Sequence, residues 1–345
     1  MRLAAGVAGA LFIAAALPAG ATSGTEATVA ERPQAEAIVE RLIELVHQNY
    51  VLEDRLEAVE ERLRAGLTAG RYREVTDPRS LSALLTAELR AGSGDLHFGV
   101  RPKPADSGEH ATGAVGEPPS EGDSGLGRVA ILDGNVGYVE VRGFPDPVVG
   151  RAAVDEAFQR LAETDALILD LRWSRGGRPQ MVAYLLSYLF DREPFVFNRF
   201  HWRNSGETVD FWTRSDVPAP RYAGSRVFAL TSRRTPSAAE GFCYHLQQFE
   251  RATLVGEPTI GAAHTYTVYT LDELQVAIPT GRPISPVSGG NWQGTGVVPD
   301  HEVAAGEALV VAYRLVLEGL LAEVVDPAVR TRLEAALESQ PDDDE

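Results

Sequence analysis

The sequence predicts an α/β protein with a mainly parallel sheet, preceded by a helical module. Residues 166–171 (ALILDL) form an apolar run typical of a buried parallel strand, and a stretch with apolar residues at helical spacing follows at 179–190. The same strand-turn-helix order recurs at 226–249, whereas residues 31–92 show helical patterns. Strands that alternate with helices in this way indicate a wound α/β core.

The amino-terminal region is predicted to be helical. Residues 35–48, 56–67 and 80–89 place Leu, Ile and Val on one face, with charged residues on the other. A Gly-rich turn then brings His97 to the start of a short extended segment. These patterns define an N-terminal helical domain at 31–100.

Residues 101–127 are rich in Pro, Gly, Ser and acidic residues, which is typical of a disordered linker or a long loop. The core domain is predicted at 128–338, and an acidic tail at 339–345. The core begins with a hairpin that turns at 133–135. Its further predicted elements are a helix at 148–161, strands at 166–171, 227–230 and 254–257, helices at 179–190 and 237–249, a hairpin at 264–280, a Gly-rich loop at 288–300 and helices within 305–337.

Residues 1–21 combine an early Arg, an apolar run and a final Ala-Gly-Ala, as in a cleaved secretory signal peptide. The run is too short and too rich in Ala and Gly for a convincing membrane span, although an uncleaved anchor is the alternative. We therefore expect an exported protein, periplasmic or extracellular, without membrane attachment after cleavage.

Composition excludes several functional classes. The formal net charge of −17 argues against nucleic acid and anionic membranes as partners. Cys243 is the single cysteine, so there is no disulfide framework despite the export signal. No metal-binding cluster, phosphate-binding loop or dinucleotide motif is evident, and we expect no cofactor and no metal.

Ser237 lies where the strand at 227–230 passes through a turn into a helix. Such a turn can expose a nucleophilic hydroxyl, and the first N–H groups of the helix can bind an oxyanion. Ser237 to Glu240 also fits a capping box, in which the serine only caps the helix. Thr235-Pro236 offers a second helix start that does not need Ser237 as the cap.

Two other segments have residues suited to the same chemistry. Gly176-Gly177 follows the buried strand at 166–171 and precedes a helix, an arrangement that can bind an anion or be an ordinary turn. His97 is suited to general-base catalysis near neutral pH, but a lone histidine in a loop is also compatible with a structural role.

Seven segments in order along the chain resemble the tail-specific, or C-terminal processing, serine peptidases, in the branch with tricorn protease and interphotoreceptor retinoid-binding protein. They are Asn49–Val51, Gly94–His97, Val136–Tyr138 with Phe144, Asp170–Arg172 with Gly176-Gly177, Thr235–Glu240, Arg251-Ala252 with Val255–Glu257, and Gly294–Asp300. The resemblance implies a crotonase/ClpP-like α/β core with an N-terminal helical domain. No segment requires the PDZ domain that the processing branch usually carries.

The resemblance also implies a choice between two catalytic designs. The processing branch pairs its serine with a lysine, but Ala262 occupies the corresponding position here. The tricorn-like design takes its base from an N-terminal histidine, which matches His97, and orients it with polar and acidic residues. Related sequences are expected to read Trp-Glu-Gly where this chain has Gln293, and a neutral Gln stabilises an imidazolium less than a carboxylate does.

The resulting prediction is an exported serine peptidase that acts on peptides or proteins. Ser237 is the nucleophile and His97 the base, with His245 and His264 as alternative bases. The backbone of Gly176, Gly177 and Ala238 forms the oxyanion hole. Asp95 and Gln293 are candidate orienting residues, and Glu240 is assigned a capping or structural role.

Two other interpretations remain open. The same fold serves as a non-catalytic module that binds peptides or hydrophobic ligands, an interpretation that Gln293 favours. A crotonase-like enzyme acting on a coenzyme A thioester fits the fold but not the export signal. The oligomeric state does not follow from the sequence.

Overall fold

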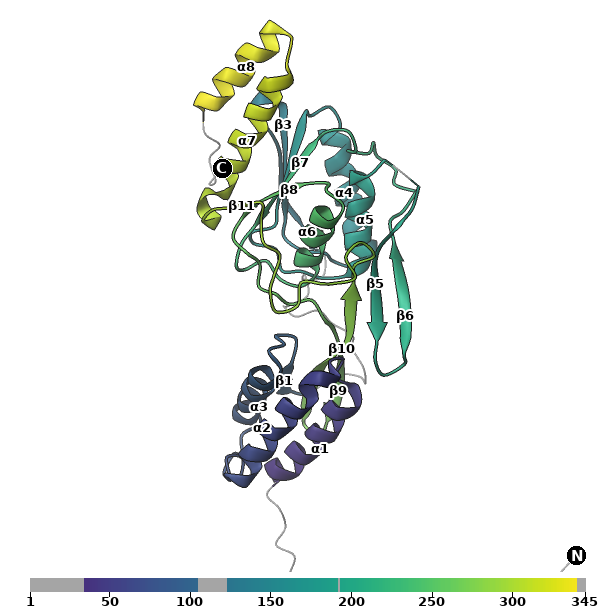
Figure 1. Cartoon of the computed structure of the whole chain (residues 1–345), viewed down its shortest axis with the longest axis vertical. Coiled ribbons are helices and arrows are strands. Elements are labelled where there is room, and N and C mark those ends of the chain that lie inside the picture. The colour runs from purple at the N-terminus through teal and green to yellow at the C-terminus, as the bar shows by residue number, and fades with distance from the viewer. Residues whose placement is uncertain (1–33, 105–122, 192, 340–345) are drawn as a thin grey trace, which may run out of the picture. The chain divides into compact units, whose positions relative to one another are not determined.

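A six-stranded sheet forms the centre of the core in the computed structural model, which describes residues 34–104, 123–191 and 193–339. Its strand order is β11-β8-β7-β4-β3-β2 (Figure 1). The strands β3, β4, β7, β8 and β11 run parallel, and β2 pairs antiparallel with β3 at the edge. Their bounds are β2 Leu126–Leu132, β3 Val136–Val141, β4 Ala166–Asp170, β7 Arg226–Thr231, β8 Thr253–Gly256 and β11 His301–Glu302.

Helices cover both faces of this sheet (Figure 1). On one face lie α4 (Pro147–Leu161), α5 (Pro179–Leu189) and α6 (Ala238–Gln248), and on the other α7 (Ala308–Glu323) and α8 (Pro327–Glu338). Side chains of β4 alternate between the two faces, because successive strand residues point to opposite sides. Leu167 and Leu169 therefore join one hydrophobic cluster, and Ala166 and Ile168 the other.

A second, antiparallel sheet has the strand order β1-β10-β5-β6, and β9 also pairs with β10. Its strands are β1 Gly99–Pro102, β5 Val196–Trp202, β6 Glu207–Trp212, β9 Thr265–Leu271 and β10 Leu274–Ile284. In the register, Ala277 of β10 lies opposite both Gly99 of β1 and Val268 of β9. This pairing brings the chain just after His97 close to the chain that leaves His264.

The helical region consists of α1 (Gln34–Asn49), α2 (Leu56–Thr68) and α3 (Pro78–Ser93). Apolar residues of the hairpin β9–β10, including Leu274, Val276 and Ile278, complete its hydrophobic cluster. The described residues accordingly form one compact unit.

The predicted mixed α/β fold with an N-terminal helical region is confirmed, and so are the elements predicted within the described residues. The hairpin β5–β6 was not predicted, although aromatic and β-branched residues flank a turn that contains Asn204-Ser205-Gly206. The predicted signal peptide lies outside the described residues, as does the tail beyond Ser339. Of the predicted linker at 101–127, the described ends belong partly to β1 and β2, and 105–122 lie outside.

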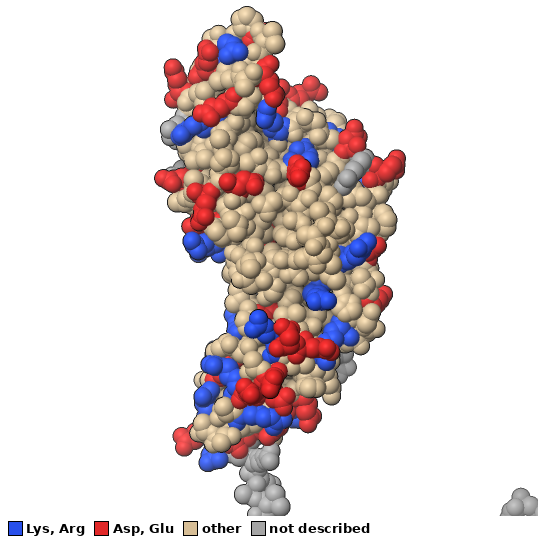
Figure 2. All heavy atoms as spheres, in the orientation of Figure 1, with Lys and Arg blue, Asp and Glu red and all other residues tan. Residues whose placement is uncertain are grey.

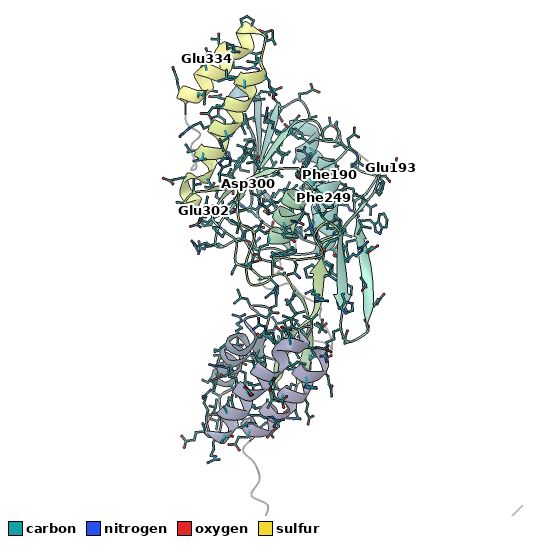
Figure 3. All side chains as sticks on the ribbon, viewed as in Figure 1. Phe190, Glu193, Phe249, Asp300, Glu302 and Glu334 are labelled. Atoms are coloured by element: carbon teal, nitrogen blue, oxygen red, sulfur yellow. The ribbon has the colours of Figure 1, made fainter. Side chains whose placement is uncertain are left out.

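Contacts around α6 join the later segments of the core. The rings of Phe190 and Phe249, labelled in Figure 3, follow α5 and α6 and lie 6.0 Å apart between centroids. Asp300, also labelled, accepts the N–H of Leu254 at 2.8 Å and so ties the Gly-rich loop to β8.

Acidic and basic side chains are interspersed on the face shown in Figure 2. None of the helices within the described ranges is long and apolar enough to cross a bilayer.

Candidate active site

Ser237 has a strained backbone at the turn between β7 and α6. Its φ of 52° and ψ of −118° lie in a region that residues with a side chain rarely adopt. Holding this conformation costs on the order of 1–3 kcal/mol, and such strain is concentrated at functional sites. A sharp strand-to-helix turn of this kind presents a serine hydroxyl above the carboxyl end of a sheet.

The preceding turn is tied to the end of the neighbouring strand, β4. The Thr235 hydroxyl donates to Leu171 O at 2.9 Å, and the Ser232 hydroxyl donates to Arg172 O at 2.6 Å. Arg172 is in turn held by a buried ion pair with Asp170 at 2.7 Å. The carboxyl ends of two adjacent parallel strands therefore fix the position of Ser237.

Glu240 accepts four hydrogen bonds within the protein interior. Its donors are the N–H groups of Ser237 (2.7 Å), Gly261 (2.5 Å) and Ala262 (2.9 Å) and the hydroxyl of Thr259 (2.6 Å). Burial raises the pKa of Glu240 to about 7, against the opposing effect of these bonds. The carboxyl group thus joins the Ser237 turn to the segment that leads to His264, consistent with its predicted structural role.

His97 lies beside Ser237, with 3.4 Å between His97 Nε2 and Ser237 Oγ. This is longer than a typical hydrogen bond, but catalytic pairs are often loose before a substrate binds. The side chain is 1% exposed, and burial is the main cause of a lowered pKa of His97, although Asp95 acts in the opposite direction. The imidazole is therefore neutral near pH 7 and able to accept a proton.

The sequence places His97 by ending α3 at Gly94, whose φ of 70° is readily adopted by glycine. The following turn is closed by Asp95, because Asp95 Oδ1 accepts the N–H of His97 at 3.0 Å. The same Oδ1 is 3.7 Å from His97 Nδ1. His97 Nδ1 has no hydrogen-bond partner among the described residues.

The second oxygen of Asp95 binds a different histidine. Asp95 Oδ2 is 2.6 Å from His264 Nδ1, and both side chains are buried. Burial alone raises the pKa of Asp95, but the hydrogen bond to His264 and the proximity of His97 outweigh it and hold the pKa well below its usual range. Asp95 is therefore a carboxylate, and His264 Nδ1 carries the hydrogen between them.

Gly176 lies directly against the Ser237 turn. A Cβ added to Gly176 would lie 3.0 Å from Pro236 O and 3.2 Å from the Cβ of Ser237, and its φ of 75° also favours glycine. The N–H of Gly176 has a long contact of 3.5 Å to Ser174 Oγ. Within the described part of the chain, the N–H groups of Gly177 and Ala238 donate no hydrogen bond.

Other sequence candidates lie elsewhere. Gln293 Oε1 accepts the N–H of Ala263 at 2.8 Å and that of His264 at 3.4 Å, and no hydrogen bond between described residues joins it to His97. His245 is buried in an aromatic environment, with its ring 5.0 Å from that of Phe197, and burial lowers the pKa of His245 to about 3.

Two other catalytic arrangements, a Ser–Lys pair and a metal centre, find no support among the described residues. The single lysine in the sequence, Lys103, follows β1. Its backbone N–H donates to Glu273 O in the turn of the β9–β10 hairpin. Among residues 34–104, 123–191 and 193–339, no group of His, Cys, Asp and Glu side chains is placed to hold a metal ion.

Residues 135–303 match peptidase family S41, and residues 21–124 match the N-terminal domain of S41 peptidases described for eukaryotic interphotoreceptor retinoid-binding protein. The chain belongs to peptidase family S41. Both matches are in the expected order, and the predicted family is confirmed. The S41 assignment makes the chain a hydrolase and implies peptide or protein substrates.

Solved structures with the same fold include proteases. A photosystem II D1 C-terminal processing protease aligns with a TM-score of 0.53 at 15% identity, over 79% of this chain and 94% of the other. A lipoprotein from Streptococcus agalactiae aligns with a TM-score of 0.53 at 14% identity, over 83% and 97% of the two chains. The tricorn protease aligns with a TM-score of 0.51 at 14% identity, over 88% of this S41 chain but 36% of its own length.

Sequence reasoning did not find the pairing of Asp95 with His264 in this S41 chain. It considered His264 only as an alternative base and Asp95 only as a partner of His97. The signal was weak, because the two residues are 169 positions apart and only the pairing of β1, β9 and β10 brings them together.

Proposed function

We propose that this chain is an exported serine peptidase in which Ser237 attacks the peptide carbonyl and His97 is the general base. The observation that carries the proposal is the 3.4 Å approach of His97 Nε2 to a serine held at φ 52° and ψ −118°. A serine that only caps a helix needs neither this backbone strain nor a buried, neutral imidazole beside its hydroxyl.

The proposed reaction follows from these positions. Ser237 Oγ forms a bond to the carbonyl carbon while its proton passes to His97 Nε2. His97 then donates the proton to the leaving amine, and water hydrolyses the acyl-enzyme by the reverse sequence of proton transfers. Asp95 stabilises the imidazolium through its negative charge, with Oδ1 3.7 Å from His97 Nδ1.

The tetrahedral oxyanion is assigned to the N–H groups of Gly177 and Ala238, supported by Gly176. Neither N–H group donates a hydrogen bond within the described ranges. Ala238 follows Ser237 directly, and Gly177 follows Gly176, which lies against the Ser237 turn. Each such donor typically lowers the barrier by ~3–4 kcal/mol. Export is proposed from the signal-like sequence at 1–21.

Labelling with a fluorophosphonate probe tests this function. The purified mature protein is expected to react, Ser237→Ala to show no labelling, and His97→Ala to label far more slowly. A folded wild-type protein that does not react would overturn the Ser–His assignment and favour the alternative of a non-catalytic binding module on the same fold.

A further inference from the structure

We propose that His264 is a positioning residue that holds the Asp95 carboxylate in the orientation His97 needs. This inference rests on the proposed function, since it assigns His97 as the base. The observation behind it is that Asp95 is shared by two histidines, with its shortest hydrogen bond, 2.6 Å from Oδ2, made to His264 Nδ1.

The geometry around His97 shows why its carboxylate needs an external support. In the serine-protease arrangement, a carboxylate accepts directly from the far nitrogen of the base and fixes its orientation. Here Asp95 Oδ1 accepts the His97 backbone N–H at 3.0 Å, while the ring nitrogen Nδ1 is 3.7 Å away. With the carboxylate held in place, a modest rotation of the His97 ring would bring Nδ1 to the same oxygen once the imidazolium forms.

His264 limits how Asp95 can rotate. The Asp95 carboxylate has one oxygen on the His97 backbone and the other on His264 Nδ1, so its plane is fixed at both ends. Without the His264 donor, the carboxylate is free to turn about its Cβ–Cγ bond and Oδ2 is left buried without a partner. Charge-assisted bonds of this length are among the stronger ones in proteins.

The His264 backbone is itself anchored from two sides. Ala262 donates its N–H to Glu240 at 2.9 Å, and Ala263 and His264 donate theirs to Gln293 Oε1. The amide oxygen accepts both N–H groups, which gives Gln293 a function where an acidic residue was expected. The anchored segment links the Ser237 turn, through Glu240, to the histidine pair.

The charged and titratable groups that face His97 are few. Burial is the largest single influence on the pKa of His97 and lowers it; Asp95 raises that pKa, and His264 and Arg90 lower it to a smaller extent. The ring of Tyr266 lies 6.0 Å from that of His97. Changes at His264 therefore act on His97 chiefly through Asp95.

Two substitutions at one position separate positioning from direct catalysis. Asn places its amide N–H₂ close to where His Nδ1 lies, so His264→Asn keeps the donor to Asp95, whereas His264→Leu removes it. His264→Leu is expected to reduce the rate of fluorophosphonate labelling by about 10²-fold, the scale of a 1 Å misplacement at an active site. His264→Asn is expected to stay within about threefold to fivefold of the wild type on the same scale.

The control is His201→Leu, which removes another Nδ1 hydrogen bond, to Thr208 on the neighbouring strand β6. It is expected to label at the wild-type rate, and thermal unfolding shows which variants are folded. If His264→Leu labels like the wild type, the inference is wrong. If folded His264→Asn is as slow as His264→Leu, His264 acts through its ring and not as a donor to Asp95, which also overturns it.

A measurement without turnover distinguishes failure of this inference from failure of the proposed function. In protein with ¹⁵N-labelled histidine, nitrogen shifts report which ring nitrogen carries the hydrogen. His264 is expected to be protonated at Nδ1 and to lose that state in Asp95→Ala, which removes both oxygens of the acceptor. Protonation of wild-type His264 at Nε2 alone would contradict the inference, even if Ser237 proves unreactive.

Discussion

Replacement of Asp95 by Asn is the most informative single change at this site, because it removes a charge and little volume. Asp95 Oδ1 lies 3.7 Å from His97 Nδ1, and neither side chain is exposed. At an effective dielectric constant of about 20, the attraction between a carboxylate and an imidazolium at this distance is roughly 4 kcal/mol. Since about 1.4 kcal/mol corresponds to a factor of ten, labelling of Ser237 should slow by about 10³-fold.

The pH dependence has a defined direction. His97 acts as a base only when it is neutral, and burial lowers its pKa from 6.5, so the acid limb of the wild-type labelling rate should lie below pH 6.5. Asp95 raises the pKa of His97. In Asp95→Asn the limb should therefore move to still lower pH while the plateau rate falls.

The assay is the labelling rate with a fluorophosphonate between about pH 5 and 9, the range in which histidine changes its charge. Ser237→Ala provides the background. Asp210→Asn, which removes a carboxylate paired with Arg199 on the exposed hairpin, is the matched control and should react like the wild type. A folded Asp95→Asn whose plateau rate stays within about fivefold of the wild type would refute the reasoning, since the predicted loss is about 10³-fold.

Three further changes test other parts of the account. Gly176→Ala places a Cβ 3.2 Å from that of Ser237 at a φ of 75°, so we expect about 10²-fold slower labelling. The control is Gly224→Ala, whose added Cβ has no atom within 4 Å and which should label at the wild-type rate. Equal labelling rates in the two variants would contradict this expectation. Glu240→Gln leaves two of the four donors facing an amide N–H₂, so urea unfolding should show that the free energy of unfolding falls by roughly 2–5 kcal/mol. A fall below about 0.5 kcal/mol would contradict the structural role of Glu240. Burial depresses the pKa of His245 from 6.5 to about 3, so its contribution to stability is present above pH 6.5 and is lost as the pH falls. Between pH 7.5 and 5 this loss in the free energy of unfolding is about 2 kcal/mol. Over the same pH range, the free energy of unfolding of His245→Leu should fall by about 2 kcal/mol less than that of the wild type. The same pH dependence of stability in the variant and the wild type would rule out this contribution of His245.

Much of the fold could be predicted because its elements have strong local patterns. The apolar run at β4 and the helical spacing of α5 and α6 are set by burial on both sides of a parallel sheet. The hairpin β5–β6 was missed because its pattern is weaker. β6 is mostly exposed, and only Val209 and Phe211 alternate with exposed residues, which is a short signal for a half-buried strand.

The residues of the candidate site that belong to local sequence motifs could be predicted, but the contacts between distant segments could not. Ser237 and His97 lie in recognisable local contexts, a strand-turn-helix and a Gly-rich turn. The bond of Asp95 to His264 depends on the register of β1, β9 and β10. The bond of Gln293 to the backbone of Ala263 depends on the contact between two loops, in which Gly294 donates its N–H to Gly261 O. Register is a tertiary property, so no spacing within one segment indicates it.

The central claim, that Ser237 is an activated nucleophile, is tested most directly by locating the adduct after reaction with a fluorophosphonate. Intact-mass measurement should show one added group per chain, and tandem mass spectrometry of the digested protein should place it on Ser237 and on no other serine. An unmodified folded protein, or an adduct on a different residue, would contradict the account.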